Sequence, residues 1–245
     1  MCSSDLSGAA KPGSLRTETG YSPSGYPDGE ETVNVSRYGK PDAGTVLIQP
    51  VDDHDLEGIE NEVAEIQRLI GDDFCLIAIK VSSWNTDLSP WKAPAVFGKE
   101  DFGEGAGSTL TEVLKYTVDP TKTYYIGGYS LAALFAVWAA YQTDVFSGVA
   151  AASPSVWFPG FVDSFMHDNE CRAKAVYLSL GDREAKTRNP VMATVENRIR
   201  EAYELLKTQG IETTLEWNKG NHFADADIRT AKAFAWVMKS SEGRK

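Results

Sequence analysis

The chain has 245 residues, of which 42% are hydrophobic and 24% are charged, and its formal net charge is -11. This composition is typical of a globular protein that is long enough for one large α/β domain. The negative charge argues against binding to nucleic acid or to an anionic membrane surface. The three cysteines show no paired spacing, so we predict neither a disulfide framework nor a zinc site.

The first 29 residues form a segment of unusual composition. Met1–Gly29 is rich in Gly, Ser and Pro and lacks hydrophobic periodicity, which predicts a disordered tail. It has neither the basic nor the apolar part of a signal peptide, which favours a cytoplasmic location. Its first letters, "MCSSDL", are also what a GTG start followed by the end of a common sequencing adapter would encode. Our hypothesis is that Met1–Leu6 is a read artefact and that the true start, with any leader, is missing.

Short apolar runs alternate with helical patterns after this tail. Strands are predicted at 32–38 ("TVNVSRY"), 45–50 ("TVLIQP") and 74–80 ("FCLIAIK"). Between the second and the third of these, apolar residues recur at spacings of three and four and predict a helix: Leu56, Ile59, Val63, Ile66 and Ile70. Asp55 can cap the start of this helix. A long loop is predicted at 81–107, and a helix at 108–118 ("STLTEVLKYTV").

The second half of the chain continues the alternation. Strands are predicted at 123–128, 148–153, 175–181 and 212–217, with helices at 131–141, at about 190–209 and from near Asp225 to the end. The helix at 131–141 is the longest apolar run, and it is too short to span a membrane. Continuous apolar strands that alternate with helices predict a mostly parallel sheet with helices on both faces. We therefore predict one α/β domain at 30–245.

The segment "KTYYIGGYSLAALFAVWAA" passes from a strand to a helix through two glycines and a serine. The pattern Gly128-x-Ser130-x-Ala132 at such a junction is typical of a nucleophile elbow, in which small residues permit a very tight turn. Ser130 would then stand clear of the sheet, and the amide of Leu131 would point toward the same place. The alternative is that the glycines make an ordinary turn and that Ser130 only caps the helix.

A serine nucleophile requires a histidine base, and the sequence contains only three histidines. In proteins with a nucleophile elbow, the chain order is serine, then acid, then histidine. His54 precedes the serine, and His167 precedes the strand that would carry the acid. His222 lies in "NKGNHFADAD", between the last strand and the last helix, where the base is expected. The alternative is an ordinary polar loop residue.

The orienting acid should follow the strand at 175–181. Asp182 and Glu184 both lie there, in "GDREAK". Asp182 comes directly after the strand, and Glu184 has the longer reach. Only one carboxylate is needed to orient one imidazole, so the other is expected to be a solvated loop charge.

These segments resemble an esterase group of the α/β-hydrolase superfamily that includes feruloyl esterases, S-formylglutathione hydrolases and siderophore-lactone esterases. The matching blocks are "IGGYSLAALFAVWAA", "AASPSVWF", "LSLGDREAK" and "KGNHFADADIRTAKAFAWV", within about residues 45–238. The resemblance implies ester hydrolysis without a cofactor. It places the acid three residues after Gly181, at Glu184. It also implies an oxyanion-hole donor after the strand at 45–50, where Pro50 has no amide hydrogen and Val51 or Asp52 is left.

We therefore predict a serine carboxylic-ester hydrolase that acts on a small-molecule ester through Ser130, His222 and Glu184, with Asp182 as the alternative acid. Leu131 and Val51 are the predicted oxyanion donors. The loops that follow the strands carry aromatic side chains, and we predict that Trp84, Trp91, Trp157 and His54 line the substrate cleft. The alternative for each ring is that it packs the loop onto the sheet.

No metal site is predicted. Consecutive ligands in "DDHD", Asp52 to Asp55, would be sterically awkward, and helix capping explains these residues better. Two other functions use the same scaffold. An acyltransferase would share the acyl-enzyme and would form esters with an added alcohol faster than it hydrolyses them. A silent binding protein would show equal rates for the wild type and Ser130→Ala. The oligomeric state does not follow from the sequence.

Overall fold

The computed structural model describes residues 35–242, and the predictions for Met1–Gly29 lie outside the described residues. Seven strands form one sheet in the order β1-β3-β2-β4-β5-β6-β7. Strand β1 is antiparallel to β3, and the other neighbours are parallel. The strands are β1 (Val35–Gly39), β2 (Thr45–Val51), β3 (Cys75–Lys80), β4 (Thr123–Tyr129), β5 (Phe146–Ala152), β6 (Ala175–Gly181) and β7 (Glu212–Asn218).

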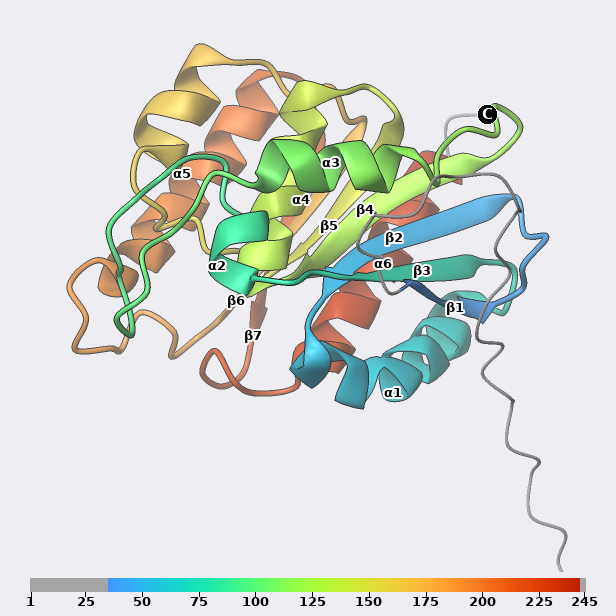
Figure 1. Ribbon diagram of the computed structural model, residues 1–245, viewed down its shortest axis with the longest axis horizontal. Coiled ribbons are helices and arrows are strands. Elements are labelled where there is room, and N and C mark those ends of the chain that lie inside the picture. The colour runs from blue at the N-terminus through green and yellow to red at the C-terminus, as the bar shows by residue number, and fades with distance from the viewer. Residues whose placement is uncertain (1–34, 243–245) are drawn as a thin grey trace, which may run out of the picture. The chain divides into compact units, whose positions relative to one another are not determined.

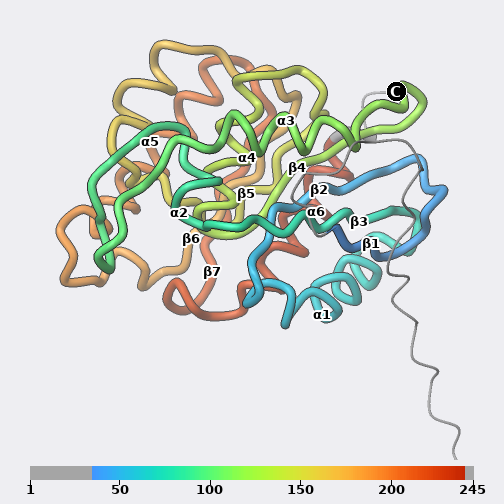
Figure 2. Tube along the Cα trace, viewed as in Figure 1, coloured from blue at the N-terminus to red at the C-terminus, as the bar shows by residue number. Residues whose placement is uncertain are grey.

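Helices cover both faces of this sheet (Figures 1 and 2). On one face lie α1 (Asp53–Ile70) and α6 (Ala226–Glu242), and on the other lie α3 (Ala106–Leu114), α4 (Ser130–Gln142) and α5 (Val195–Thr208). Alternation along the strands produces two cores: Leu47 of β2 packs with α1 and α6, whereas Val46 and Ile48 pack on the other face. The predicted mostly parallel α/β architecture is confirmed.

The connections place the carboxyl ends of distant strands side by side. The chain leaves β2 for β3 on one side and then returns past β2 to β4 on the other. In open α/β sheets, ligands bind outside the carboxyl ends of the strands where the strand order reverses in this way. The ends of β2 and β4 carry Val51 and Ser130, so the topology brings two of the predicted site positions to the same edge.

Several element boundaries differ from the predictions. The cap of α1 is Asp52, not Asp55. The side chain of Asp52 accepts a hydrogen bond from the Asp55 amide at 2.8 Å, and the side chain of Asp55 accepts one from the Asp52 amide at 3.2 Å. The predicted loop at 81–107 contains a short helix, α2 (Trp84–Asp87), and a bridge between Ala93 and Phe102. Helix α3 begins and ends earlier than predicted.

The segment η1 (Phe161–Met166) is a π-helix that was not predicted, and η2 (Met192–Thr194) is a short 3-10 turn that leads into α5, within the helix predicted at about 190–209. The brevity of η1 explains why it was missed, because six residues do not display a helical period.

Candidate active site

Ser130 stands at the turn between β4 and α4, and its backbone has a φ of 57°. This left-handed conformation is rare for a residue with a side chain and marks a strained turn. The turn requires small neighbours: a Cβ on Gly128, whose φ is 157°, would lie 2.8 Å from the Cβ of Ala132. The sequence Gly-x-Ser-x-Ala therefore folds into a sharp strand-to-helix elbow that presents the Ser130 hydroxyl at the edge of the sheet.

His222 lies in the loop between β7 and α6, and its ring contacts the serine. The Nε2 atom of His222 is 3.0 Å from the Ser130 Oγ, and its Nδ1 atom is 2.7 Å from the Glu184 Oε2. The loop is anchored by Tyr129, whose hydroxyl donates to the His222 carbonyl at 2.9 Å. The structure thus brings Ser130, His222 and Glu184, which are far apart in the sequence, into one hydrogen-bonded row.

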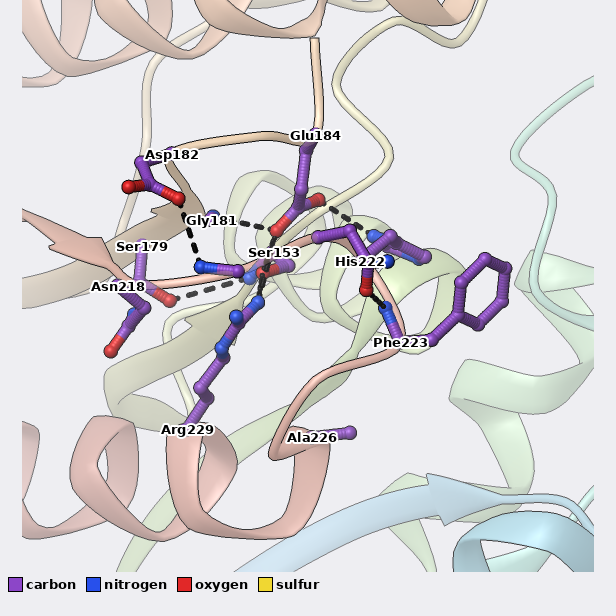
Figure 3. Close-up of polar contacts among 12 residues, drawn as sticks. Ser153, Ser179, Gly181, Asp182, Glu184, Asn218, His222, Phe223, Ala226 and Arg229 are labelled. Carbon is purple, nitrogen blue, oxygen red and sulfur yellow. Dashed lines mark hydrogen bonds and ion pairs between the residues drawn. The ribbon is translucent and has the colours of Figure 1, made fainter. Parts of the chain in front are cut away.

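The Glu184 carboxylate is buried, with a side chain only 4% exposed, and is surrounded by donors (Figure 3). Its Oε1 accepts from the Gly181 amide at 2.6 Å and from the Ser153 hydroxyl at 2.8 Å. Burial raises the pKa of Glu184, but the hydrogen bond and charge of His222, helped by the Gly181 and Ser153 donors, outweigh burial and lower that pKa overall. The carboxylate is therefore held ionised beside the imidazole.

Asp182 has a different position. Its Oδ1 accepts from the Gly220 amide at 2.8 Å, and its own amide donates to the Asn218 carbonyl at 2.8 Å. These bonds tie Asp182 to the loop that carries His222, away from the imidazole nitrogen that Glu184 contacts (Figure 3). Of the two acids that the sequence left open, Glu184 is the one that contacts the ring.

Comparison with known proteins identifies the fold. No family model and no curated protein matches the sequence. Among solved structures, an IroE-like serine hydrolase from Shewanella oneidensis aligns with a TM-score of 0.67 at 13% identity, over 84% of this chain and 75% of that one. The siderophore hydrolase EstA from Aspergillus nidulans aligns with a TM-score of 0.56 at 17% identity, over 94% of this chain and 100% of that one. A Bacillus cereus carboxylesterase aligns with a TM-score of 0.55 at 15% identity, over 85% and 95%.

The chain has the α/β-hydrolase fold. The solved structures that it resembles include siderophore esterases and a carboxylesterase, in agreement with the esterase-group resemblance of the sequence blocks. At identities of 12–17%, these similarities establish the fold and not the reaction.

The two predicted oxyanion-hole donors, Leu131 and Val51, lie at the start of α4 and at the end of β2. The Leu131 amide belongs to the first turn of α4, where amides have no intrahelical acceptor. The Val51 carbonyl accepts from the Val81 amide at 3.0 Å, and Val51 pairs with Lys80 in β3. Because the amide and carbonyl of one strand residue point to the same side, the Val51 amide also faces β3. The Asp52 amide is bonded to Asp55 at 3.2 Å. The role of Val51 stays a prediction that this arrangement does not favour.

The predicted cleft residues occupy different environments. Trp157 is buried and packs against Phe97 and Phe102, and the Trp91 indole donates to the Pro159 carbonyl at 3.0 Å and stacks near Phe161. These contacts fasten the loop after β3 to the loop after β5.

The two remaining cleft candidates lie on helices. Trp84 is half-buried in α2. The side chain of His54 is 88% exposed, beside Glu57 on α1. A substrate contact by any of the four predicted cleft residues stays a prediction.

Within residues 35–242, no group of three or more His, Cys, Asp or Glu side chains is placed to hold a metal ion. The "DDHD" segment makes the capping box of α1. No helix in this described part has the length and the apolar character that a membrane crossing requires.

Four residues around the row were not predicted as part of the site. Ser155, buried in the "SPSVWF" block, has its Oγ 3.2 Å from the Ser130 Oγ, and its amide donates to the Ser130 carbonyl at 3.0 Å. Ser153, Tyr129 and Arg229 surround Glu184 and the His222 loop. Ser153 and Ser155 both lie in the "SPSVWF" block of the family resemblance, which could have marked them. Nothing local marks Arg229, because it lies within the pattern of a helix.

Proposed function

We propose that the protein is a serine carboxylic-ester hydrolase in which Ser130 is the nucleophile, His222 the general base and Glu184 the orienting acid. The observation that carries the proposal is the row of two bonds, 3.0 Å from Ser130 to His222 and 2.7 Å from His222 to Glu184. These distances lie within the reach that proton transfer requires. The row also follows the order nucleophile, base, acid on which this chemistry depends.

In the first half-reaction, the Ser130 Oγ attacks the acyl carbonyl while His222 Nε2 removes its proton. The imidazolium that forms is stabilised by the Glu184 Oε2, which bonds to the opposite nitrogen. The tetrahedral oxyanion would be stabilised by the Leu131 amide at the start of α4, where the helix dipole favours negative charge. The imidazolium then protonates the leaving alcohol, and the acyl group stays on Ser130.

In the second half-reaction, His222 removes a proton from water, and the resulting hydroxide attacks the acyl-enzyme. The proton then returns from His222 to the Ser130 oxygen as the carboxylic acid leaves. Each residue is thereby restored, and the balance of atoms requires only ester and water.

The test is hydrolysis of p-nitrophenyl acetate and butyrate by the purified protein beside Ser130→Ala. We expect the wild type to turn over and Ser130→Ala to lose activity by several orders of magnitude, with both proteins folded. A fluorophosphonate probe should label the wild type and leave Ser130→Ala unlabelled. Equal rates for the two proteins would overturn the proposal.

We also propose which esters to test first. Two of the similar structures are described as a siderophore hydrolase and an enterobactin esterase, and a third as a carboxylesterase. Aromatic side chains crowd the loops after β3 and β5. We therefore propose aryl and lactone esters as the first panel to compare with short alkyl esters, with kcat/KM as the measure.

A further inference from the structure

Arg229 on α6 is a buried cation, with only 2% of the residue exposed. Within residues 35–240, it is the only Lys or Arg that is buried as a whole residue. A guanidinium is withdrawn from water only at a large cost unless acceptors surround it. Its contacts therefore indicate what the fold gains by burying it.

The guanidinium points toward Glu184 and Ser153 (Figure 3), and its hydrogen bonds reach four segments around Glu184 and His222. Nη1 donates to the Glu184 Oε1 at 3.1 Å and to the Tyr129 hydroxyl at 3.0 Å, with Ser153 at 3.4 Å. Nη2 donates to the Lys219 carbonyl at 3.0 Å, in the loop that carries His222. One side chain thus joins the ends of β4, β5 and β6 to the base-bearing loop.

The two oxygens of Glu184 have separate partners. Oε1 accepts from Arg229, the Gly181 amide and the Ser153 hydroxyl, whereas Oε2 is bonded to His222 Nδ1. The bonds to Oε1 therefore fix the carboxylate in an orientation in which Oε2 points at the imidazole. Little room remains for adjustment, because a Cβ on Gly181 would lie 2.5 Å from the Gly220 carbonyl and 2.9 Å from the Glu184 Oε1.

We propose that Arg229 is a positioning residue of the reaction, which fixes the Glu184 carboxylate and offsets part of its charge. The proposal rests on the proposed function. By offsetting the charge, Arg229 limits how tightly the Glu184–His222 pair holds an extra proton. The base is then unprotonated, and able to act, at a lower pH than beside an unpaired buried carboxylate.

The groups that face the pair make this effect depend on Arg229. Tyr129 from the end of β4 is neutral over the working range, because burial, followed by the charge of Glu184, raises its pKa to about 12. Asp182 from the end of β6 bonds to the Gly220 amide in the same loop. Arg229 from α6 is the cation that pairs with the Glu184 Oε1, the oxygen that does not contact His222. Removal of Arg229 would leave the negative charge of Glu184 without a second cation. This charge would then stabilise a protonated imidazole more strongly.

The experiment measures kcat/KM against pH for the full chain and three variants. In Arg229→Met we expect the acidic limb to move up by about one pH unit and kcat on the plateau to fall about 10- to 100-fold. In Arg229→Lys, which keeps the charge but loses the planar fork, the limb stays near its wild-type position while kcat falls. Arg68→Met, an exposed arginine paired with Glu65 on α1, removes the same charge far from the row and should leave both unchanged.

A merely structural role would lower kcat or the melting temperature without moving the limb, and that result in Arg229→Met would overturn the proposal. If Arg229→Met does not fold, the variant Arg229→Met/Glu184→Gln, in which no buried charge is left unpaired, replaces it. Its activity should equal that of Glu184→Gln alone, because Arg229 acts through Glu184. A further loss beyond about threefold would contradict the proposal.

Fluorophosphonate labelling distinguishes a failure of the proposed function from a failure of the role of Arg229. A wild type that is not labelled and does not turn over would overturn the proposed function itself. A labelled, active wild type with an unmoved limb in Arg229→Met would overturn only the role of Arg229.

Discussion

Glu184 and Glu62 are two buried carboxylates of the same protein with opposite surroundings. Glu184, at the carboxyl end of the sheet, has donors on both oxygens, and its pKa is lowered. Glu62, on α1 beneath β2, has one donor, the Gln49 amide at 3.3 Å. Burial, with this weak bond opposing it and with the charges of Asp55 and Asp227 adding to it, holds the pKa of Glu62 well above its usual range. Burial alone therefore does not decide the charge of a carboxylate, because the hydrogen-bond donors and the charges around it also shift its pKa.

The atoms without partners at Glu62 support a neutral acid there. Within the described residues, the Oε1 atoms of Gln49 and Glu62 are both buried and both lack a hydrogen-bond partner. A proton on Glu62 would turn one of its buried acceptors into a donor and remove the charge. An ionised Glu62 would instead keep a buried charge beside one weak donor, a costly arrangement in a low-dielectric interior.

The largest expected effect is on kcat and comes from removing the charge of Glu184. Glu184→Gln should lower kcat about 10³- to 10⁴-fold, because the amide neither stabilises the imidazolium nor fixes the ring as the carboxylate does. Asp182→Asn, the matched change two residues away, should lower kcat less than about tenfold, because Asp182 holds only the loop backbone. Initial rates with p-nitrophenyl butyrate measure both. A crippled Asp182→Asn beside an active Glu184→Gln would reverse our assignment of the acid.

The sequence predicted this donor-rich site only in part. Ser130, Glu184 and His222 each follow a recognisable strand, so the topology of a parallel sheet places them at one edge. Arg229 reaches Glu184 from α6, and no pattern within its own helix marks it. Ser153 reaches Glu184 from the end of β5, where it is the first residue of the "SPSVWF" block.

Local ambiguity explains the other differences. Asp is a favourable N-cap residue at either position, so the residue type alone does not say whether Asp52 or Asp55 caps α1. Alternation along a strand assigns each side chain to a face, but a loop has no such period. The partners of Trp91 and Trp157 therefore follow only from the packing of two loops.

An intermediate effect is expected at Glu62, where stability is the measure. Glu62→Ala should lower the free energy of unfolding by about 2–3 kcal/mol, because it opens a cavity and leaves the Gln49 amide unpaired. Glu62→Gln, the matched control, keeps the shape of the neutral acid and should stay within about 0.5 kcal/mol near pH 5.

The pH dependence at Glu62 has a definite sign. The folded state keeps this proton above the ordinary value of 4.5, whereas the unfolded chain releases it. The wild type therefore loses stability as the pH rises above 4.5, and Glu62→Gln should not show this part of the loss. Urea denaturation from pH 5 to pH 8 measures the difference between the two proteins, and a difference that does not grow with pH would show that Glu62 is ionised in the folded state.

The smallest effect is expected at Asp55, a half-buried carboxylate between the two extremes. Burial, followed by the charge of Asp52, raises the pKa of Asp55 to about 6, although its Oδ2 accepts from the Asp52 amide. A raised pKa in an acid means that stability is lost as the pH rises from 3.8 through 6. Asp55→Asn should therefore be about 1 kcal/mol more stable than the wild type at pH 8, with the advantage gone near pH 4.

The control for Asp55→Asn is Glu60→Gln, which removes one negative charge from an exposed position of α1. It should leave stability nearly unchanged at both pH values, since surface charges contribute little. Thermal unfolding followed by circular dichroism at pH 4 and pH 8 measures all three proteins. Equal shifts for both variants would mean that the total charge of α1, and not the burial of Asp55, sets the pH dependence. Asp55 would then not be a case in which burial raises the pKa of a carboxylate to a value between those of Glu184 and Glu62.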